Sequence, residues 1–150
     1  MKYIKQYKIF ESNKTVTTQN VKDCFADITD NGFHIKVVFP EGGLTYGCVG
    51  IMRNPTFDAD DRIHTKPFVL DDIKETLLFA IPYIREEYGL TTKDFRVATT
   101  YARYTYVYFD DFCEQSEKHI DIYEIIWEFN VPNNLNVIHT GNLFGREAYI

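Results

Sequence analysis

The strongest constraint on the fold of this chain is a pair of strand-like segments joined by a glycine-rich turn. In residues 33–39, large apolar side chains occupy every second position, which is the period of a strand with one buried face. The sequence PEGG at 40–43 breaks this pattern, and a second strand-like segment covers residues 44–52. These two segments predict an antiparallel hairpin.

A short amphipathic helix is expected before this hairpin. Thr17 or Thr18 supplies a side chain that can cap its first turn, and Gly32 lies just past its end. Between them, apolar residues recur at the spacing of one helical face. This face consists of Val21, Phe25 and Ile28.

A longer helix is expected after the hairpin. Asp71 or Asp72 is placed to cap it, and Gly89 is expected to end it in a left-handed conformation. Pro82 lies inside the helical pattern, so we expect a kink or a break near Phe79. The apolar stripe of this helix consists of Ile73, Leu77, Ile81, Ile84 and Tyr88.

The remaining β-forming segments complete a mixed α+β pattern, while the polar stretch at 53–68 is expected to be a long loop. For residues 117–130 a helix starting at Ser116 is the alternative to a strand. The first six elements then follow the βαββαβ order of the ferredoxin-like arrangement, an antiparallel sheet with two helices on one face, with an added β-β. The further strands are expected at 3–10, 99–109, 121–130 and 135–140.

Length and composition predict one compact domain over residues 1–150, ending in a tail at 141–150. The 150 residues carry a formal net charge of −6, and 45% of them are hydrophobic. No apolar run approaches the roughly 20 residues that cross a bilayer, so we expect no membrane association. Three cysteines at widely spaced positions fit a reducing compartment, and we expect a cytoplasmic protein.

A tyrosine-rich strand supplies the candidate binding residues. Exposed rings on a sheet can anchor a partner protein, because Tyr and Trp dominate binding hot spots, or they can stack unpaired bases of single-stranded nucleic acid. Cross-strand ring pairs that stabilise the sheet, or a homodimer surface, are the structural alternatives. The candidate residues are Tyr101, Arg103, Tyr104, Tyr106, Tyr108 and Trp127.

Residues 104–109 of this segment read YTYVYF, which resembles the aromatic end of the RNP1 strand in RNA-recognition domains. The resemblance implies base stacking. However, Ala102 and Arg103 replace the basic residue and glycine that open RNP1, and the negative net charge disfavours binding to a phosphate backbone. The acidic segment 110–128 instead favours a partner protein with a basic surface.

An acidic stretch in the predicted loop at 53–68 is the candidate metal site. Asp58, Asp60, Asp61 and His64 could ligate Mg²⁺ or Mn²⁺ and support phosphoester hydrolysis, although the spacing does not match an EF-hand. A solvated surface loop without a metal is the simpler interpretation. The chain contains no GxSxG or P-loop motif, and acidic neighbours disfavour activation of the Cys113 thiol, so the sequence favours a function without catalysis and without a cofactor.

The opening sequence MKYIKQYKIFE, together with abundant Lys, Asn, Ile, Tyr and Phe, resembles small uncharacterised proteins of tailed bacteriophages. The resemblance implies a protein of the bacterial host cytoplasm, acting on a host protein as an accessory factor or serving as a minor structural component. Our leading hypothesis is therefore a non-catalytic interaction protein. Single-stranded nucleic-acid binding and a metal-dependent phosphoesterase are the alternatives.

Overall fold

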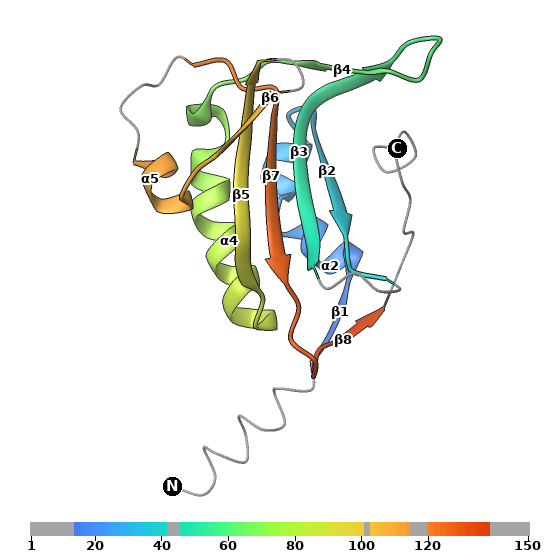
Figure 1. The fold of residues 1–150 in the computed structure, drawn as a ribbon, viewed down its shortest axis with the longest axis vertical. Helices are drawn as coiled ribbons and strands as arrows, with labels where there is room; N and C mark the ends of the chain where they lie inside the picture. The colour runs from blue at the N-terminus through green and yellow to red at the C-terminus, as the bar shows by residue number, and fades with distance from the viewer. Residues whose placement is uncertain (1–13, 42–45, 101–102, 115–119, 139–150) are drawn as a thin grey trace, which may run out of the picture.

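The computed structural model describes residues 14–41, 46–100, 103–114 and 120–138, and they form a mixed α+β fold (Figure 1). The strands are β1 (Thr15–Thr17), β2 (Phe33–Val38), β3 (Tyr46–Phe57), β4 (Ile63–Lys66), β5 (Thr91–Thr100), β6 (Arg103–Tyr106), β7 (Glu124–Asn130) and β8 (Asn136–Ile138). The helices are α2 (Thr18–Asp23), α3 (Ala26–Thr29), α4 (Lys74–Tyr88) and α5 (Phe109–Cys113), with a 3-10 turn, η1 (Leu70–Asp72), before α4. No helix of the described residues is both long and apolar enough to span a membrane.

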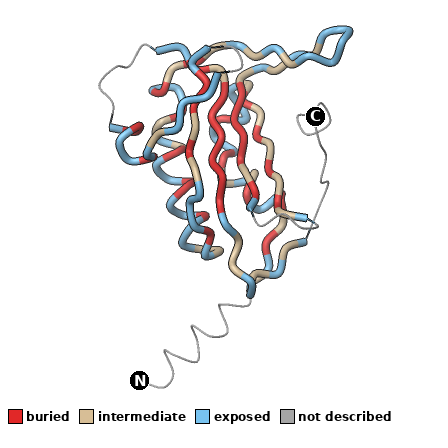
Figure 2. Tube along the Cα trace, viewed as in Figure 1, coloured by how far each residue is buried: buried red, intermediate tan, exposed pale blue. Residues whose placement is uncertain are grey.

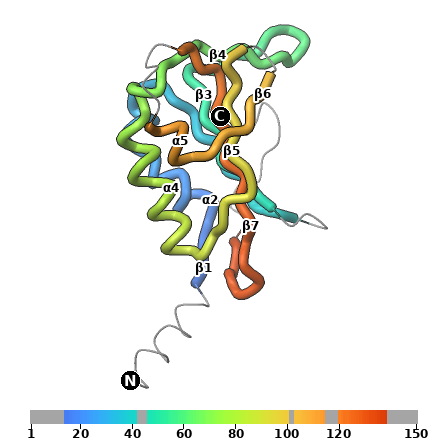
Figure 3. The backbone as a smooth tube through the Cα atoms, turned by 60° about the vertical axis from the view of Figure 1, so that its left-hand side comes forward, coloured from blue at the N-terminus to red at the C-terminus, as the bar shows by residue number. Residues whose placement is uncertain are grey.

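Six strands form the main sheet: five follow the order β2-β3-β7-β5-β6, and the sixth, β4, pairs with the far end of β3. Every pairing in this sheet is antiparallel. Strands β1 and β8 form a separate parallel pair at the lower end of the molecule. The helices lie behind the sheet in Figure 1 and to one side of it in Figure 3, so the described helices cover a single face.

Strand β7 occupies the centre of the sheet. Because β7 is antiparallel to both of its neighbours, β3 and β5 are parallel to each other, and α4 lies between them in the sequence. The expected ferredoxin-like order is not confirmed: the expected strand at 3–10 lies outside the described residues, as does the tail at 141–150, and the inner neighbour of β3 is β7. The expected strand at 121–130 is confirmed for β7, and the expected strand at 135–140 for β8.

The hydrophobic core fills the space between the sheet and the helices, where the buried residues gather in Figure 2. Alternate residues of β7 point into it, and Trp127 packs on Phe129 with ring centroids 5.1 Å apart. Gly47 of β3 has no room for a side chain: an added Cβ would lie 2.4 Å from the carbonyl oxygen of Val38 and 2.8 Å from the Phe129 ring. A side chain at position 47 would therefore separate β2 from β3.

The first helical segment begins as the sequence predicts, but the expected single helix is divided into α2 and α3 by a turn at residues 24–25. The Thr17 side chain accepts a hydrogen bond from the backbone N–H of Asn20, and the Asn20 side chain accepts one from Thr17 in return. This capping box satisfies two backbone donors at the start of α2. The expected apolar face is confirmed as buried, and Gly32 follows with a positive φ of 85°.

The long helix differs from expectation at its start and around its proline. The Asp72 carboxylate accepts a hydrogen bond from the N–H of Val69, which closes the 3-10 turn, so no side chain caps α4 itself. The helix runs without a break through Pro82, and Pro82 lies on the exposed side of the helix. Gly89 ends it in the expected left-handed conformation, with φ of 68°.

Two expectations about strands and loops are wrong. The segment 53–68 is a hairpin arm rather than a loop, because β3 continues to Phe57 and turns back as β4. The tyrosine segment is not one strand over 99–109. Instead β5 begins at Thr91, turns after Thr100 into the short β6, and leads into α5.

Candidate partner-binding surface

The face of the sheet opposite the helices carries charged and aromatic side chains in register. We call this the open face, because no described helix covers it (Figures 1 and 3). The strand pairing places its residues in rows that run across the sheet. One row consists of Lys36, Gly50, Ile126, Arg96 and Tyr106, and a second, on the β7 side, consists of Glu124, Ala98 and Tyr104.

Glu128 on the central strand lies at the middle of an ion-pair network. Its residue is only 6% exposed, and its carboxylate lies 3.1 Å from the Arg96 guanidinium and 3.6 Å from Nζ of Lys93. A carboxylate removed from water is costly unless it is paired in this way. The buried Nε of Arg96 has no hydrogen-bond partner among the described residues, and the guanidinium is held by Glu128 and by a side-chain hydrogen bond with Tyr106.

Glu124, only 4% exposed, is held by the hydroxyl of Tyr104, which donates a hydrogen bond to its carboxylate. Burial, and then the bond to Glu124, raises the pKa of Tyr104 well above its ordinary value. The Arg96 guanidinium lies 5.2 Å from the centre of the Tyr104 ring. On the other side of Glu128, Lys93 lies 4.4 Å from the ring of Tyr46. Contacts therefore link strands β3, β5, β6 and β7 and hold the open face in one arrangement.

The outer edge of this face exposes tyrosine rings beside a groove. Tyr106 is 62% exposed on β6, and Tyr108 is 81% exposed where the chain enters α5. Both line a groove of about 450 Å³ together with Lys93 and Asp94 from the bulge in β5. We call this surface, made of Tyr104, Tyr106, Tyr108 and Lys93, the tyrosine edge.

The other candidate binding residues do not belong to the tyrosine edge. Trp127 is only 1% exposed, and its indole N–H donates to Oγ1 of Thr92 at 3.0 Å, so its expected role as a surface anchor is wrong. It lies on the helix side of β7 because its strand alternation puts it with the core residues. Arg103 is exposed at the start of β6, and Tyr101 lies outside the described residues.

The candidate metal residues form the tip of the hairpin arm. The Asp58 carboxylate accepts hydrogen bonds from the backbone N–H groups of Asp60 and Arg62, both at 2.9 Å, and lies 3.0 Å from Nε2 of His64. The bond to His64, followed by the backbone bonds, lowers the pKa of Asp58. Asp61 adopts a left-handed φ of 56° in the same turn. The Asp58 carboxylate thus shapes the turn.

The described residues contain no group of three or more His, Cys, Asp or Glu side chains placed to hold a metal ion. The three cysteines form no disulfide. Burial raises the pKa of the Cys113 thiol to about 11, and burial also raises the pKa values of Cys24 and Cys48. None of the three thiols therefore has the lowered pKa of an activated nucleophile.

Known proteins supply no template for interpreting these surfaces. Comparisons with protein-family models, with curated proteins and with solved structures give no match for this chain. A function must therefore be inferred from the open face itself. Its centre is an ion-pair network, and its edge has exposed aromatic rings beside a groove.

Sequence reasoning missed Lys93 and Arg96, because the strand was expected to begin at residue 99, whereas β5 begins at Thr91. The alternation of charged and apolar residues in TTKDFRV was the available signal. The alternation in β7 did place Glu124 and Glu128 opposite the apolar residues. Their burial could not be read from the sequence, because it depends on side chains from three other strands.

Proposed function

We propose that this chain is a non-catalytic interaction protein that binds a partner protein through the tyrosine edge. The observation that carries the proposal is the position of Tyr106 and Tyr108. Both rings are exposed beside a groove, next to the ion pairs and hydrogen bonds that order the open face. Tyrosine rings contribute large contact area at little entropic cost, and a surface that is already ordered loses little entropy on binding.

The charge next to the tyrosine edge favours a basic partner surface. The exposed acidic residues Asp110, Asp111 and Glu114 lie on or beside α5, directly after Tyr108. Glu124 and Glu128 do not add to this surface, because they are buried and engaged in the network. The resemblance to phage proteins extends the proposal: the partner would be a protein of the bacterial host.

The test compares capture of partners by the parent protein and by the double variant Tyr106→Ala, Tyr108→Ala. Both rings are exposed, so we expect the melting temperature to stay nearly unchanged while the partner is lost. A matched control removes an exposed apolar side chain that lies outside the tyrosine edge, Ile138→Ala on β8, and should retain the partner. The partner is identified by mass spectrometry, and its affinity is then measured with purified components.

Three results would contradict the proposal. A large loss of stability in the double variant would show that the rings are structural. Unchanged affinity for the purified partner would place the binding surface elsewhere. Captured material that disappears after nuclease treatment would indicate instead that the rings stack nucleic-acid bases.

A further inference from the structure

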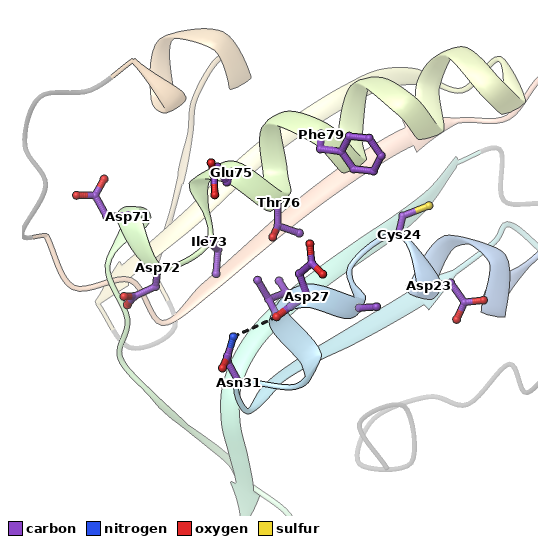
Figure 4. A pocket seen from close by; sticks show the side chains of 12 residues that line it. Asp23, Cys24, Asp27, Asn31, Asp71, Asp72, Ile73, Glu75, Thr76 and Phe79 are labelled. Atoms are coloured by element: carbon purple, nitrogen blue, oxygen red, sulfur yellow. Dashed lines mark hydrogen bonds between the residues drawn. The ribbon is translucent and has the colours of Figure 1, made fainter.

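A second surface lies on the helix side of the sheet, where a groove of about 630 Å³ separates α2 and α3 from the start of α4. Figure 4 shows the α4 residues along one side of this groove and residues of the α2–α3 segment along the other. The apolar part of its lining includes Ile28 and Ile73, which belong to the core. The groove is therefore formed by the packing of the helices and not by a loop.

The rim of this groove is strongly acidic. Its lining includes five carboxylates and, among the described residues, no lysine or arginine. Asp72 lies 3.8 Å from the Arg53 guanidinium, whereas the described residues provide no ion pair for the exposed residues Asp27, Asp71 or Glu75. The five carboxylates belong to Asp23, Asp27, Asp71, Asp72 and Glu75.

An exposed apolar face of α4 continues from the groove. Phe79 lines the groove and is 65% exposed, and its ring stacks on Tyr83 one turn later, with centroids 5.8 Å apart and planes 10° apart. Leu78 beside them is also exposed. Two stacked aromatic rings left in water on a helix indicate a contact surface, because burying them against a partner is favourable.

We propose that this acidic groove and the adjoining Phe79–Tyr83 pair bind a segment of a partner protein that carries lysine or arginine side chains around an apolar anchor. The apolar anchor would lie on the two rings, and the cations would lie against Asp27, Asp71 and Glu75. Charge complementarity selects this partner: an acidic segment or a nucleic-acid backbone would meet like charge along the whole rim. Arginine suits the site well, since it pairs with carboxylates and also stacks on aromatic faces.

This surface is distinct from the tyrosine edge, because its residues come from the helix layer and those of the tyrosine edge come from the sheet and the start of α5. An experiment can therefore contradict either proposal without contradicting the other. Loss of the Phe79–Tyr83 pair would leave the tyrosine edge intact, and loss of Tyr106 and Tyr108 would leave the groove intact.

The test measures binding of a fluorescein-labelled peptide in which arginines and leucines alternate at helical spacing. A second peptide has the arginines replaced by glutamates, and a third has the leucines replaced by serines. We expect the first peptide to bind the full chain, with resonances of Asp27, Glu75 and Phe79 shifting in NMR titrations. The other two peptides should bind at least about tenfold more weakly, because one lacks the cations for the carboxylates and the other lacks the apolar anchor for the rings.

Charge-neutral variants separate the groove from the overall negative charge. We expect Asp27→Asn, Asp71→Asn and Glu75→Gln together to weaken the first peptide about tenfold at low salt. A matched triple variant outside the groove, Asp60→Asn, Asp61→Asn and Asp121→Asn, has the same net charge and should change the affinity less than about twofold. Phe79→Ala should also weaken the peptide, and it should lower the salt dependence of binding very little.

Equal losses in the two triple variants would overturn the proposal, because they would show attraction to the whole acidic protein. Equal binding of the serine peptide would overturn the role of the aromatic pair. A variant with Lys2→Glu, Lys5→Glu and Lys8→Glu tests whether this chain's own basic segment is the occupant: tighter peptide binding in that variant would replace the partner in our proposal with residues 1–10. Sedimentation that shows a dimer dissociated by Phe79→Ala would replace it with a second copy.

Discussion

Alternate residues of β7 are buried on opposite faces of the sheet, and the two faces stabilise this burial in different ways. On the helix side, Ile125, Trp127 and Phe129 are removed from water by apolar neighbours. On the open face, Glu124 and Glu128 are almost equally buried, but hydrogen bonds and ion pairs compensate for their desolvation. The apolar side accounts for most of the stability that this strand contributes, since area removed from water is favourable at about 25 cal/mol per Å². The charged side determines which side chains of the neighbouring strands contact Glu124 and Glu128.

This difference predicts that truncations on the two faces have different costs. The largest loss is expected for Phe129→Ala, which leaves a cavity beside Trp127 and Gly47 in the core. We expect the free energy of unfolding to fall by about 3–5 kcal/mol. Chemical denaturation followed by the fluorescence of the single tryptophan measures this loss. A loss below about 1 kcal/mol would show that the core beside β7 is loosely packed.

A smaller loss is expected for Glu128→Gln on the open face. The glutamine keeps the size of the side chain but removes the charge that faces Arg96 and Lys93. Because Arg96 and Lys93 are partly exposed and can be solvated, we expect a loss of about 1–2 kcal/mol. The matched control is Asp94→Asn, whose exposed pair with Lys93 should contribute less than about 0.5 kcal/mol. Equal losses for Glu128→Gln and Asp94→Asn would remove the distinction between a buried and an exposed carboxylate.

Among the buried positions of β7 and their partners, the smallest loss is expected for Tyr104→Phe, which removes one hydroxyl and keeps the ring beside Arg96. The Glu124 carboxylate then loses the hydrogen bond from Tyr104, and we expect a cost of about 1 kcal/mol. The same hydroxyl has a raised pKa in the folded protein, so its contribution to stability is present below pH 10 and is lost as the pH rises above it. Stability measured between pH 9 and pH 11 should fall more steeply in the parent than in Tyr104→Phe. Parallel curves would contradict the burial of this phenol.

Local sequence signals predicted the parts of the fold that depend on neighbours in the chain. The hairpin of β2 and β3 and the Thr17 cap both follow from patterns within a few residues, and both were found. The segment 53–68 was misjudged because its polar residues continue a strand beyond the core, where no apolar alternation is needed. Pro82 was expected to kink or break the helix near Phe79, but α4 continues through it, and its opposite side is packed into the core.

The candidate sites show the same limit. Whether Tyr106 is exposed was left open by the sequence, and the structure exposes its ring; Trp127, offered as an anchor from its residue type, is buried. The network around Glu128 joins residues more than thirty positions apart, as does the groove between α3 and α4. Such sites are set by which strands and helices become neighbours. The order of the sheet decides this, and the order could not be derived from local periodicity.

The position of β7 also bears on how the chain is made. Synthesis delivers β3 and β5 before the strand that lies between them, so a nascent chain that has not reached residue 130 holds two long strands without their shared partner. Their inner edges would present unpaired amide and carbonyl groups, which are templates for association with other chains. The sheet closes only when β7 inserts between two strands that are already present. Release of an incomplete product would therefore be a greater hazard for this protein than for one whose central strands emerge first.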